Sequence, residues 1–208
     1  MWLVFMALFC IHLVYGNSLP KWLFLTSRYL PTIVIFTYVF VTEPNHPHFT
    51  ALLSIGILLA VLADVSFNHF NDRYFFTYST SLLAHLAFYF ATLMMLHNPP
   101  TLWLSILIAS VGVIIYLLLL PKLASYKFIT AIYFIVSIFL LWSSGEYWLE
   151  INAMPALLTF IGILFFVSFN TLQSIVRVTG TRTALLDKML TVCFFTFQGL
   201  LVLSIHTL

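Results

Sequence analysis

The stretch MPALLTFIGILFFVSFNTLQSIV, residues 154–176, contains no charged side chain. A helix needs about 20 predominantly apolar residues to cross the hydrocarbon core of a bilayer. The run is continuous rather than alternating, which favours a helix over a strand. Since only helices and closed barrels can span hydrocarbon, this stretch predicts a transmembrane helix.

The rest of the chain has the same character. Of its 208 residues, 62% are hydrophobic and only 7% are Asp, Glu, Lys or Arg, whereas a soluble domain averages about 25% charged residues. This composition excludes a soluble domain, a disordered chain, a nucleic-acid-binding protein and a disulfide scaffold. Cys10 and Cys193 lie in apolar runs and are expected to be small buried hydrophobic residues.

Proline, asparagine, glycine and charged residues divide the chain into eight apolar segments joined by short connections. We therefore predict a single domain over residues 1–208, an all-α polytopic membrane bundle of eight transmembrane helices. The predicted spans are 1–15, 22–42, 49–68, 74–96, 101–120, 126–144, 154–176 and 188–207.

The basic residues are distributed asymmetrically. All of them lie in or beside the first, third, fifth and seventh connections, while acidic Glu43, Glu146 and Glu150 belong to the other side. The positive-inside rule places the basic connections in the cytoplasm and both termini outside. This pattern suits a bacterial inner membrane, in which both termini would be periplasmic. The basic residues are Lys21, Arg28, Arg73, Lys122, Lys127, Arg177, Arg182 and Lys188.

Five polar side chains are expected inside the bilayer at a common depth, roughly 10–18 Å from the basic side at 1.5 Å per helical residue. Ionisable groups at such depth are costly and usually functional, so a shared depth predicts a site in the bundle core. They come from five different spans: Arg28, Asp64, His85, Asn170 and Gln198.

Structural roles for these residues remain open. Asp64 and Arg28 could form an ion pair that holds two helices together, or Arg28 could extend to the interface along its long stem. His85 could be a hydrogen-bonded packing residue, and Asn170 and Gln198 could link neighbouring helices.

Motifs for soluble chemistry are absent from the sequence: there is no P-loop, GxGxxG, HExxH or GxSxG. No pair of histidines at helical spacing accompanies a carboxylate, so neither a metal nor a cofactor is predicted. Glu146, beside Gly145 and Trp148, is expected at a helix end or a tight turn.

Several short motifs, taken in order along the whole chain, resemble those of the YhhN family of lysoplasmalogenase-like membrane proteins. The family's Gly-Asp corresponds to Ala63-Asp64, and a second family aspartate corresponds to Asn170. The other matching positions are Ala84-His85, Trp142 with Gly145 and Glu146, Phe160 with Gly162, and Phe194-Phe195 with Gln198.

The resemblance implies cleavage of the vinyl ether bond of a membrane lysophospholipid, with release of a fatty aldehyde and a glycerophospho-alcohol. Proton delivery to the β-carbon starts this reaction, and a carboxyl surrounded by hydrocarbon retains its proton more readily than one in water. We therefore expect Asp64 to be the acid, His85 an orienting group or base, and Asn170 a ligand for water or head group. Gln198 and Arg28 are expected to bind substrate.

Two other functions remain open at the level of sequence. A protein that has lost the second carboxylate could bind lipid without cleaving it. A small transporter could be built on the same band of polar groups, since transporters place their sites near the bilayer midplane.

Overall fold

The computed structural model describes residues 2–15, 19–41, 46–69, 74–123 and 127–207, and within these ranges it contains eight α-helices and one short 3₁₀ turn. This confirms the predicted all-α class. The helices are α1 (Trp2–Tyr15), α2 (Lys21–Val41), α3 (Pro47–His69), α4 (Tyr74–Leu93), α5 (Leu102–Leu119), α6 (Lys127–Ile151), α7 (Met154–Thr179) and α8 (Ala184–Thr207), with the turn η2 at Leu120–Lys122.

Five helices of the described part are long and apolar enough to cross a membrane: α3, α5, α6, α7 and α8. These are the helices expected of an integral membrane protein. The apolar helix α1 has 14 residues, which at 1.5 Å per residue gives about 21 Å, short of a hydrocarbon core of about 30 Å.

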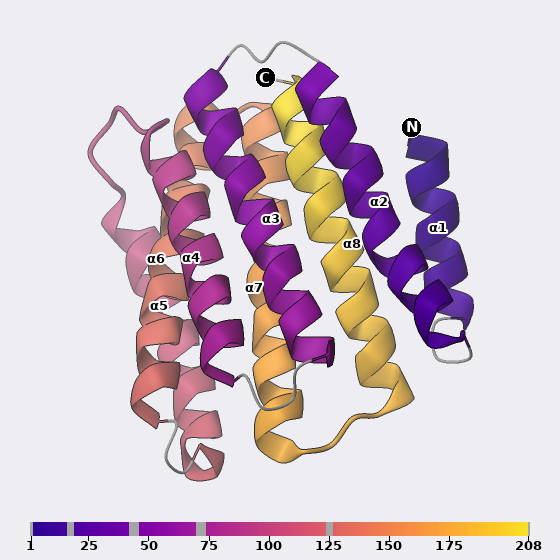
Figure 1. Ribbon diagram of the computed structural model, residues 1–208. Helices are drawn as coiled ribbons and strands as arrows, with labels where there is room; N and C mark the ends of the chain where they lie inside the picture. The colour runs from indigo at the N-terminus through magenta and orange to yellow at the C-terminus, as the bar shows by residue number, and fades with distance from the viewer. Residues whose placement is uncertain (1, 16–18, 42–45, 70–73, 124–126, 208) are drawn as a thin grey trace.

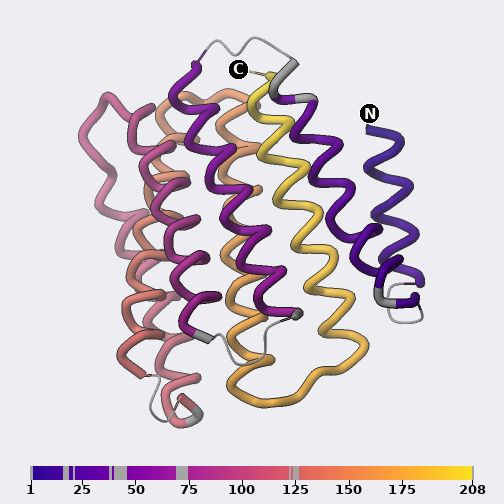
Figure 2. The backbone as a smooth tube through the Cα atoms, in the orientation of Figure 1, coloured from indigo at the N-terminus to yellow at the C-terminus, as the bar shows by residue number. Residues whose placement is uncertain are grey.

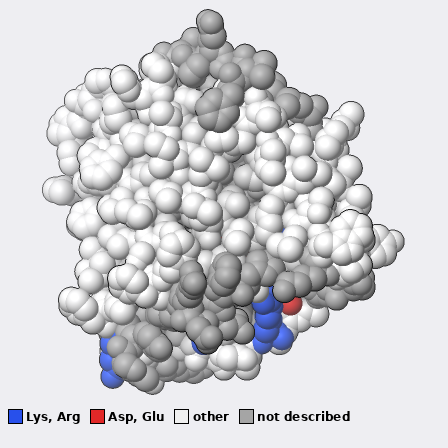
Figure 3. All heavy atoms as spheres, in the orientation of Figure 1, with Lys and Arg blue, Asp and Glu red and all other residues white. Residues whose placement is uncertain are grey.

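Successive helices run in opposite directions, so the bundle has an up-and-down arrangement (Figures 1 and 2). The start of α1 and the end of α8 lie at one end of the bundle, and α1, α3, α5 and α7 finish at the other. In the face shown in Figure 3, Lys and Arg gather at that second end, which we call the basic end. Arg73 and Glu43 lie outside the described residues.

Close packing of paired helices creates the core. Gly56 of α3 lies against the ring of Phe88 of α4 so closely that a Cβ at position 56 would overlap it. Similarly, a Cβ on Gly162 of α7 would lie 2.9 Å from Leu201 Cδ2 of α8. Buried Phe side chains fill the space between α7 and α8, among them Phe169 and Phe194 with ring centroids 5.4 Å apart.

The helix boundaries differ from the predicted spans mainly in α6 and α8. α6 continues to Ile151, past the predicted end at 144, and α8 begins at Ala184 rather than 188. Gly145 makes no turn: a Cβ there would lie 2.9 Å from Leu104 Cδ2, so this glycine lets α5 approach α6. The helix can continue because Glu146 is buried with hydrogen-bond partners.

Glu146 is therefore an interior residue of α6, not the helix-end residue that its sequence context suggested. Its Oε1 accepts hydrogen bonds from the Trp142 indole N–H at 3.0 Å and from the Thr101 backbone N–H at 2.9 Å. The Thr101 hydroxyl donates to the same oxygen. This carboxylate ties the start of α5 to α6 at the end opposite the basic residues.

Candidate functional site

Asp64 lies fully buried on α3, where it forms a two-point ion pair with Arg28 of α2. Arg28 Nε donates to Asp64 Oδ2 at 2.7 Å, and Nη2 donates to Oδ1 at 2.9 Å. Such fork-to-fork geometry gives the strongest kind of charge-assisted hydrogen bond. Of the two structural roles left open for Arg28, the ion pair is therefore the one observed, and Arg28 does not extend to the interface.

Three more donors complete the surroundings of this carboxyl group. The Tyr29 hydroxyl donates to Oδ2 at 3.0 Å, while the side-chain amides of Asn68 and Gln173 donate to Oδ1, both at 3.1 Å. Asp64 thus accepts five hydrogen bonds, which suits an ionised carboxylate, since that group only accepts. We call these residues with Arg28 the Asp64 cluster.

Arg28 is held on its other sides by rings. Its guanidinium carbon lies 4.9 Å from the centre of the Phe194 ring, a cation–π distance. Its Nη1 lies 3.4 Å from His12 Nε2, and His12 Nδ1 lies 2.8 Å from Ser27 Oγ. The amino-terminal helix therefore contributes to the setting of the ion pair through His12, which is itself buried.

A cavity of about 40 Å³ adjoins the Asp64 cluster. Asp64, Arg28 and Gln173 line its inner part, and Arg182, Asp187 and Lys188 line it at the basic end. There Arg182 Nε donates to Asp187 Oδ1 at 2.6 Å, while Lys188 is exposed. Its volume is sufficient for water, which needs roughly 10–15 Å³. We call it the Asp64 cavity; it combines a buried anion with cations toward the basic end of the bundle.

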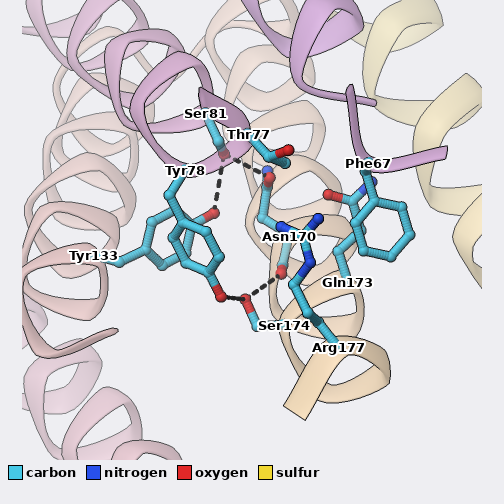
Figure 4. Close-up of a pocket in the computed structure, with 9 residues that line it drawn as sticks. All are labelled: Phe67, Thr77, Tyr78, Ser81, Tyr133, Asn170, Gln173, Ser174 and Arg177. Carbon is cyan, nitrogen blue, oxygen red and sulfur yellow. Dashed lines mark hydrogen bonds between the residues drawn. The ribbon is translucent and has the colours of Figure 1, made fainter. Parts of the chain in front are cut away.

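Asn170 lies one helical turn before Gln173 on α7 and belongs to a second polar group. Its Oδ1 accepts a hydrogen bond from Ser81 Oγ at 2.7 Å, and its Nδ2 donates to the Phe166 carbonyl at 2.8 Å. The Tyr133 hydroxyl lies 3.4 Å from Ser81 Oγ. Figure 4 shows these side chains of α4, α6 and α7 converging on one small space.

That space is a cavity of about 20 Å³, which we call the Asn170 cavity. Phe67 and Gln173 line both the Asn170 cavity and the Asp64 cavity, so the two are neighbours separated by these side chains. The other residues that line the Asn170 cavity are Thr77, Tyr78, Ser81, Tyr133, Asn170, Ser174 and Arg177.

His85 and Gln198 line neither of these two cavities. His85 Nδ1 donates to the Ser81 carbonyl at 2.7 Å, so His85 and Asn170 share Ser81 as a partner. Gln198 Oε1 accepts from Thr32 Oγ1 at 2.6 Å. His85 Nε2 and Gln198 Nε2 are buried without a hydrogen-bond partner among the described residues.

The structure thus brings the five sequence-predicted residues into three groups rather than one. Asp64 and Arg28 are paired, Asn170 and His85 meet through Ser81, and Gln198 stands apart with Thr32. Gln173 connects the first two groups and was missed by the sequence analysis. Its position three residues after Asn170, on the same helical face, was the available signal.

Asn68, Tyr29 and His12 were also missed. Asn68 follows Asp64 by one helical turn, and Tyr29 is adjacent to Arg28, so both were recognisable as neighbours of predicted residues. The contact of His12 depends on how α1 packs and had no sequence signal. Within the described residues, no group of three or more His, Cys, Asp or Glu side chains is arranged to hold a metal ion.

Residues 23–205 match the YhhN family, so the match covers α3 to α7 entirely, nearly all of α2 and α8, and none of α1. No curated protein and no solved structure matches the chain. With most of its length covered by the match, the chain belongs to the YhhN family.

Proposed function

We propose that this protein is a lysoplasmalogenase-like membrane hydrolase. It cleaves the vinyl ether bond of lysophospholipids and releases a fatty aldehyde and a glycerophospho-alcohol. The observation that carries the proposal is the position of Asp64, a fully buried carboxylate on a cavity that Arg182 and Lys188 line at the basic end. Hydrolysis of a vinyl ether requires a group that transfers protons, and binding of a substrate that carries a phosphate requires cations. Membership of a family that includes lysoplasmalogenases supports the same activity.

The reaction consumes one water molecule and needs a proton donor and then a proton acceptor. A proton added to the β-carbon of the double bond produces an oxocarbenium ion at the carbon attached to the ether oxygen. Water adds to that carbon and loses a proton, and the resulting hemiacetal separates into aldehyde and alcohol. A positioned side chain that transfers these protons accelerates such a reaction by about 10²–10⁴-fold.

We propose that Asp64 performs both transfers in succession. As a neutral acid it gives its proton to the β-carbon, and the carboxylate left behind stabilises the oxocarbenium ion. The same carboxylate then accepts the proton from the attacking water, which restores the acid. Retaining glycosidases contain a residue that alternates between acid and base in this way. With one carboxyl group in both roles, an asparagine at position 170 is compatible with hydrolysis.

Arg28 controls this cycle in our proposal. In the structure its guanidinium occupies both oxygens of Asp64. A guanidinium also binds phosphate at two points, so the phosphate of an entering lysophospholipid competes for Arg28. When Arg28 turns toward the phosphate, Asp64 takes up one proton from the bulk solvent, relayed through the water of its cavity, and becomes the acid. Lys188 adds positive charge for the same phosphate, and Arg182 does so when the phosphate replaces Asp187 as its partner.

The remaining predicted residues have positioning roles in this proposal. Asn170 orients the attacking water or the glycerol hydroxyl, because it lines a cavity next to that of Asp64. His85 orients Asn170 indirectly, since both hydrogen-bond to Ser81. Gln198 offers a buried amide N–H group to a water or to a distant part of the substrate.

We further propose that all eight helices cross the membrane, with the basic end in the cytoplasm and both termini outside. The antiparallel course of the helices supports this topology, as does the gathering of Lys and Arg at one end (Figures 1 and 3). The bacterial inner membrane is the proposed location, and a lysophospholipid of that membrane is the proposed partner.

A direct assay tests the activity. Purified protein in detergent is given 1-alkenyl lysophosphatidylethanolamine, and fatty aldehyde and glycerophosphoethanolamine are quantified. We expect equal amounts of the two products, none with Asp64→Asn, and normal amounts with Glu150→Gln, which changes a carboxylate bonded to His97 in the connection after α4. A saturated alkyl ether of the same head group should remain intact.

The two alternative functions give different results. A non-catalytic lipid-binding protein binds the alkenyl lipid and yields no aldehyde. A transporter yields no aldehyde but moves substrate across proteoliposomes. Aldehyde release that persists in Asp64→Asn would reject the role of Asp64.

A further inference from the structure

Tyr133 of α6 separates the polar interior from the lipid-facing side of the bundle. Its hydroxyl lies 3.4 Å from Ser81 Oγ beside the Asn170 cavity, and its ring lies against His85 with centroids 4.7 Å apart. The same side chain also lines two apolar hollows on the far side. Tyr133 thus lines the Asn170 cavity, where Figure 4 shows it, and also both apolar hollows.

The first of these hollows is a groove of about 180 Å³ between α5, α6 and α7. This volume exceeds the roughly 150 Å³ of an engineered apolar cavity that admits benzene in another protein. Apart from Gly112, Tyr133, Ser137 and Thr171, the lining residues are purely hydrocarbon or phenyl side chains. They are Leu107, Ile108, Val111, Ile115, Phe134, Ile138, Leu141, Phe160, Leu164 and Val167. We call this hollow the α5–α7 groove.

The direction of the α5–α7 groove matches that of a lipid tail. Along α7 its lining extends from Thr171, the neighbour of Asn170, to Phe160, a distance of about 16 Å at 1.5 Å per residue. Thr171 lies nearer the basic end, and Phe160 lies farther from it. An amphiphile with its phosphate near the basic end and its reacting bond between Asp64 and Asn170 would therefore extend its chain along this groove.

The second hollow does not extend in the direction expected of a lipid tail. It measures about 190 Å³ and lies between α4 and α6, where Phe75, Leu82, Ile129 and Ile132 are among its lining residues. Leu82 is eight residues from the first residue of α4, so the hollow lies within about 12 Å of the basic end of that helix. A chain placed there would turn back toward the head-group layer.

We propose that the α5–α7 groove binds the single hydrocarbon chain of the lysolipid. The chain passes Tyr133, which lines both the groove and the Asn170 cavity. This inference rests on the proposed function, because it assigns a binding site to the tail of that substrate. Only 6% of the residues of α5 are buried in the described structure, and Leu107 and Val111 on the α5 side of the groove are exposed.

The test uses a lysophosphatidylethanolamine with a saturated alkyl ether chain that carries a diazirine near its end. This probe cannot be hydrolysed, so binding is measured independently of activity. After illumination of the full-length protein in nanodiscs, adducts are mapped by mass spectrometry. We expect adducts on α5, α6 and α7 within the groove. Unlabelled alkyl lysolipid should suppress them at least fivefold, and an excess of diacyl phospholipid should leave them unchanged.

A matched pair of variants adds a steric test. Val111 lines the groove and is 54% exposed, whereas Val113 on the same helix lies outside it and is 50% exposed. We expect Val111→Trp to reduce groove adducts at least fivefold and Val113→Trp to leave them at the wild-type level. Both variants should elute as the wild type does from a size-exclusion column.

Three outcomes of the cross-linking experiments would overturn the inference, whatever the activity of the protein. The first is an even spread of adducts over all lipid-facing helices, which indicates bulk membrane lipid. The second is cross-linking between two copies of the chain through α5, and the third is equal labelling of the two tryptophan variants. Aldehyde release without groove adducts would reject this inference alone. Groove adducts in a protein that releases no aldehyde would support this inference and reject the hydrolase proposal alone.

Discussion

Arg28 and Asp64 form a two-point ion pair between α2 and α3 in which the side chains are only 6% and 0% exposed. Removing one partner of such a pair leaves an uncompensated buried charge and typically costs about 3–5 kcal/mol. We therefore expect Arg28→Gln or Asp64→Asn alone to lower the free energy of unfolding by that order. Thermal unfolding in detergent measures the effect.

The double variant Arg28→Gln/Asp64→Asn provides the control for this prediction. It removes both charges together, so its stability should exceed that of either single variant. Asp187→Asn, which breaks an exposed pair with Arg182, should change stability by less than about 1 kcal/mol. A double variant less stable than both singles would contradict a charge-based explanation.

Asn170→Asp should destabilise the protein without increasing hydrolysis. Asn170 Nδ2 donates to the Phe166 carbonyl at 2.8 Å, and an aspartate would place an oxygen acceptor against that carbonyl. Losing the bond and leaving a buried acceptor unsatisfied costs about 1–3 kcal/mol. Aldehyde release per folded molecule is the measurement. A clear increase would contradict the single-carboxyl mechanism and indicate that position 170 has lost a catalytic carboxylate.

Gly56→Ala should destabilise the contact between α3 and α4. A Cβ at this position would overlap the Phe88 ring, and both helices are closely packed there. Overpacking of this kind costs about 1–3 kcal/mol. Gly199→Ala is a suitable comparison, because its nearest neighbour, Phe5 Cε1, is 3.3 Å away and needs to move only slightly. Equal melting temperatures for the two variants would contradict the tight α3–α4 packing.

Glu146→Leu should loosen the start of α5, whereas Glu146→Gln should have a smaller effect. One oxygen of Glu146 accepts bonds from Trp142 and from both the backbone and the hydroxyl of Thr101. Glutamine retains such an oxygen, while leucine leaves partly buried donors without a partner, at up to about 1–3 kcal/mol for each group. Thermal unfolding and Trp142 fluorescence report the difference, and similar stability of the two variants would argue against this role.

The proposed topology predicts opposite accessibility for Lys188 and His97. Lys188 is exposed at the basic end, and His97, with a side chain 75% exposed, lies in the connection between α4 and α5 at the other end. In a chain without Cys10 and Cys193, Lys188→Cys should react with a membrane-impermeant thiol reagent only in inverted vesicles. His97→Cys should react only in intact cells. The reverse pattern would invert the topology.

The continuous apolar runs predicted the all-α class and most of the helix boundaries, because a bilayer imposes simple rules on helix length and composition. The predictions were weakest where a polar residue continues a helix. Gly145 and Glu146 were interpreted as a helix end, yet Leu104 packs over Gly145, and Thr101 and Trp142 satisfy Glu146. Such partners come from another helix or from a distant turn, so a single sequence does not reveal them.

The candidate site was predictable in composition and less so in geometry. Depth along a helix placed Arg28 and Asp64 at the same level, and the two are bonded. Depth does not specify the direction in which a side chain points around the helix axis. For this reason Gln198 shared the predicted depth but contacts Thr32 instead of the Asp64 cluster. Rotation about each axis is determined by packing between helices.

His12 contacts Arg28 from a helix that lies wholly outside the family match. Trimming the protein to its matched segment for expression would therefore remove one face of the arginine's surroundings while leaving every family motif intact. A truncated preparation that releases no aldehyde would therefore not test the function proposed for the chain that includes α1.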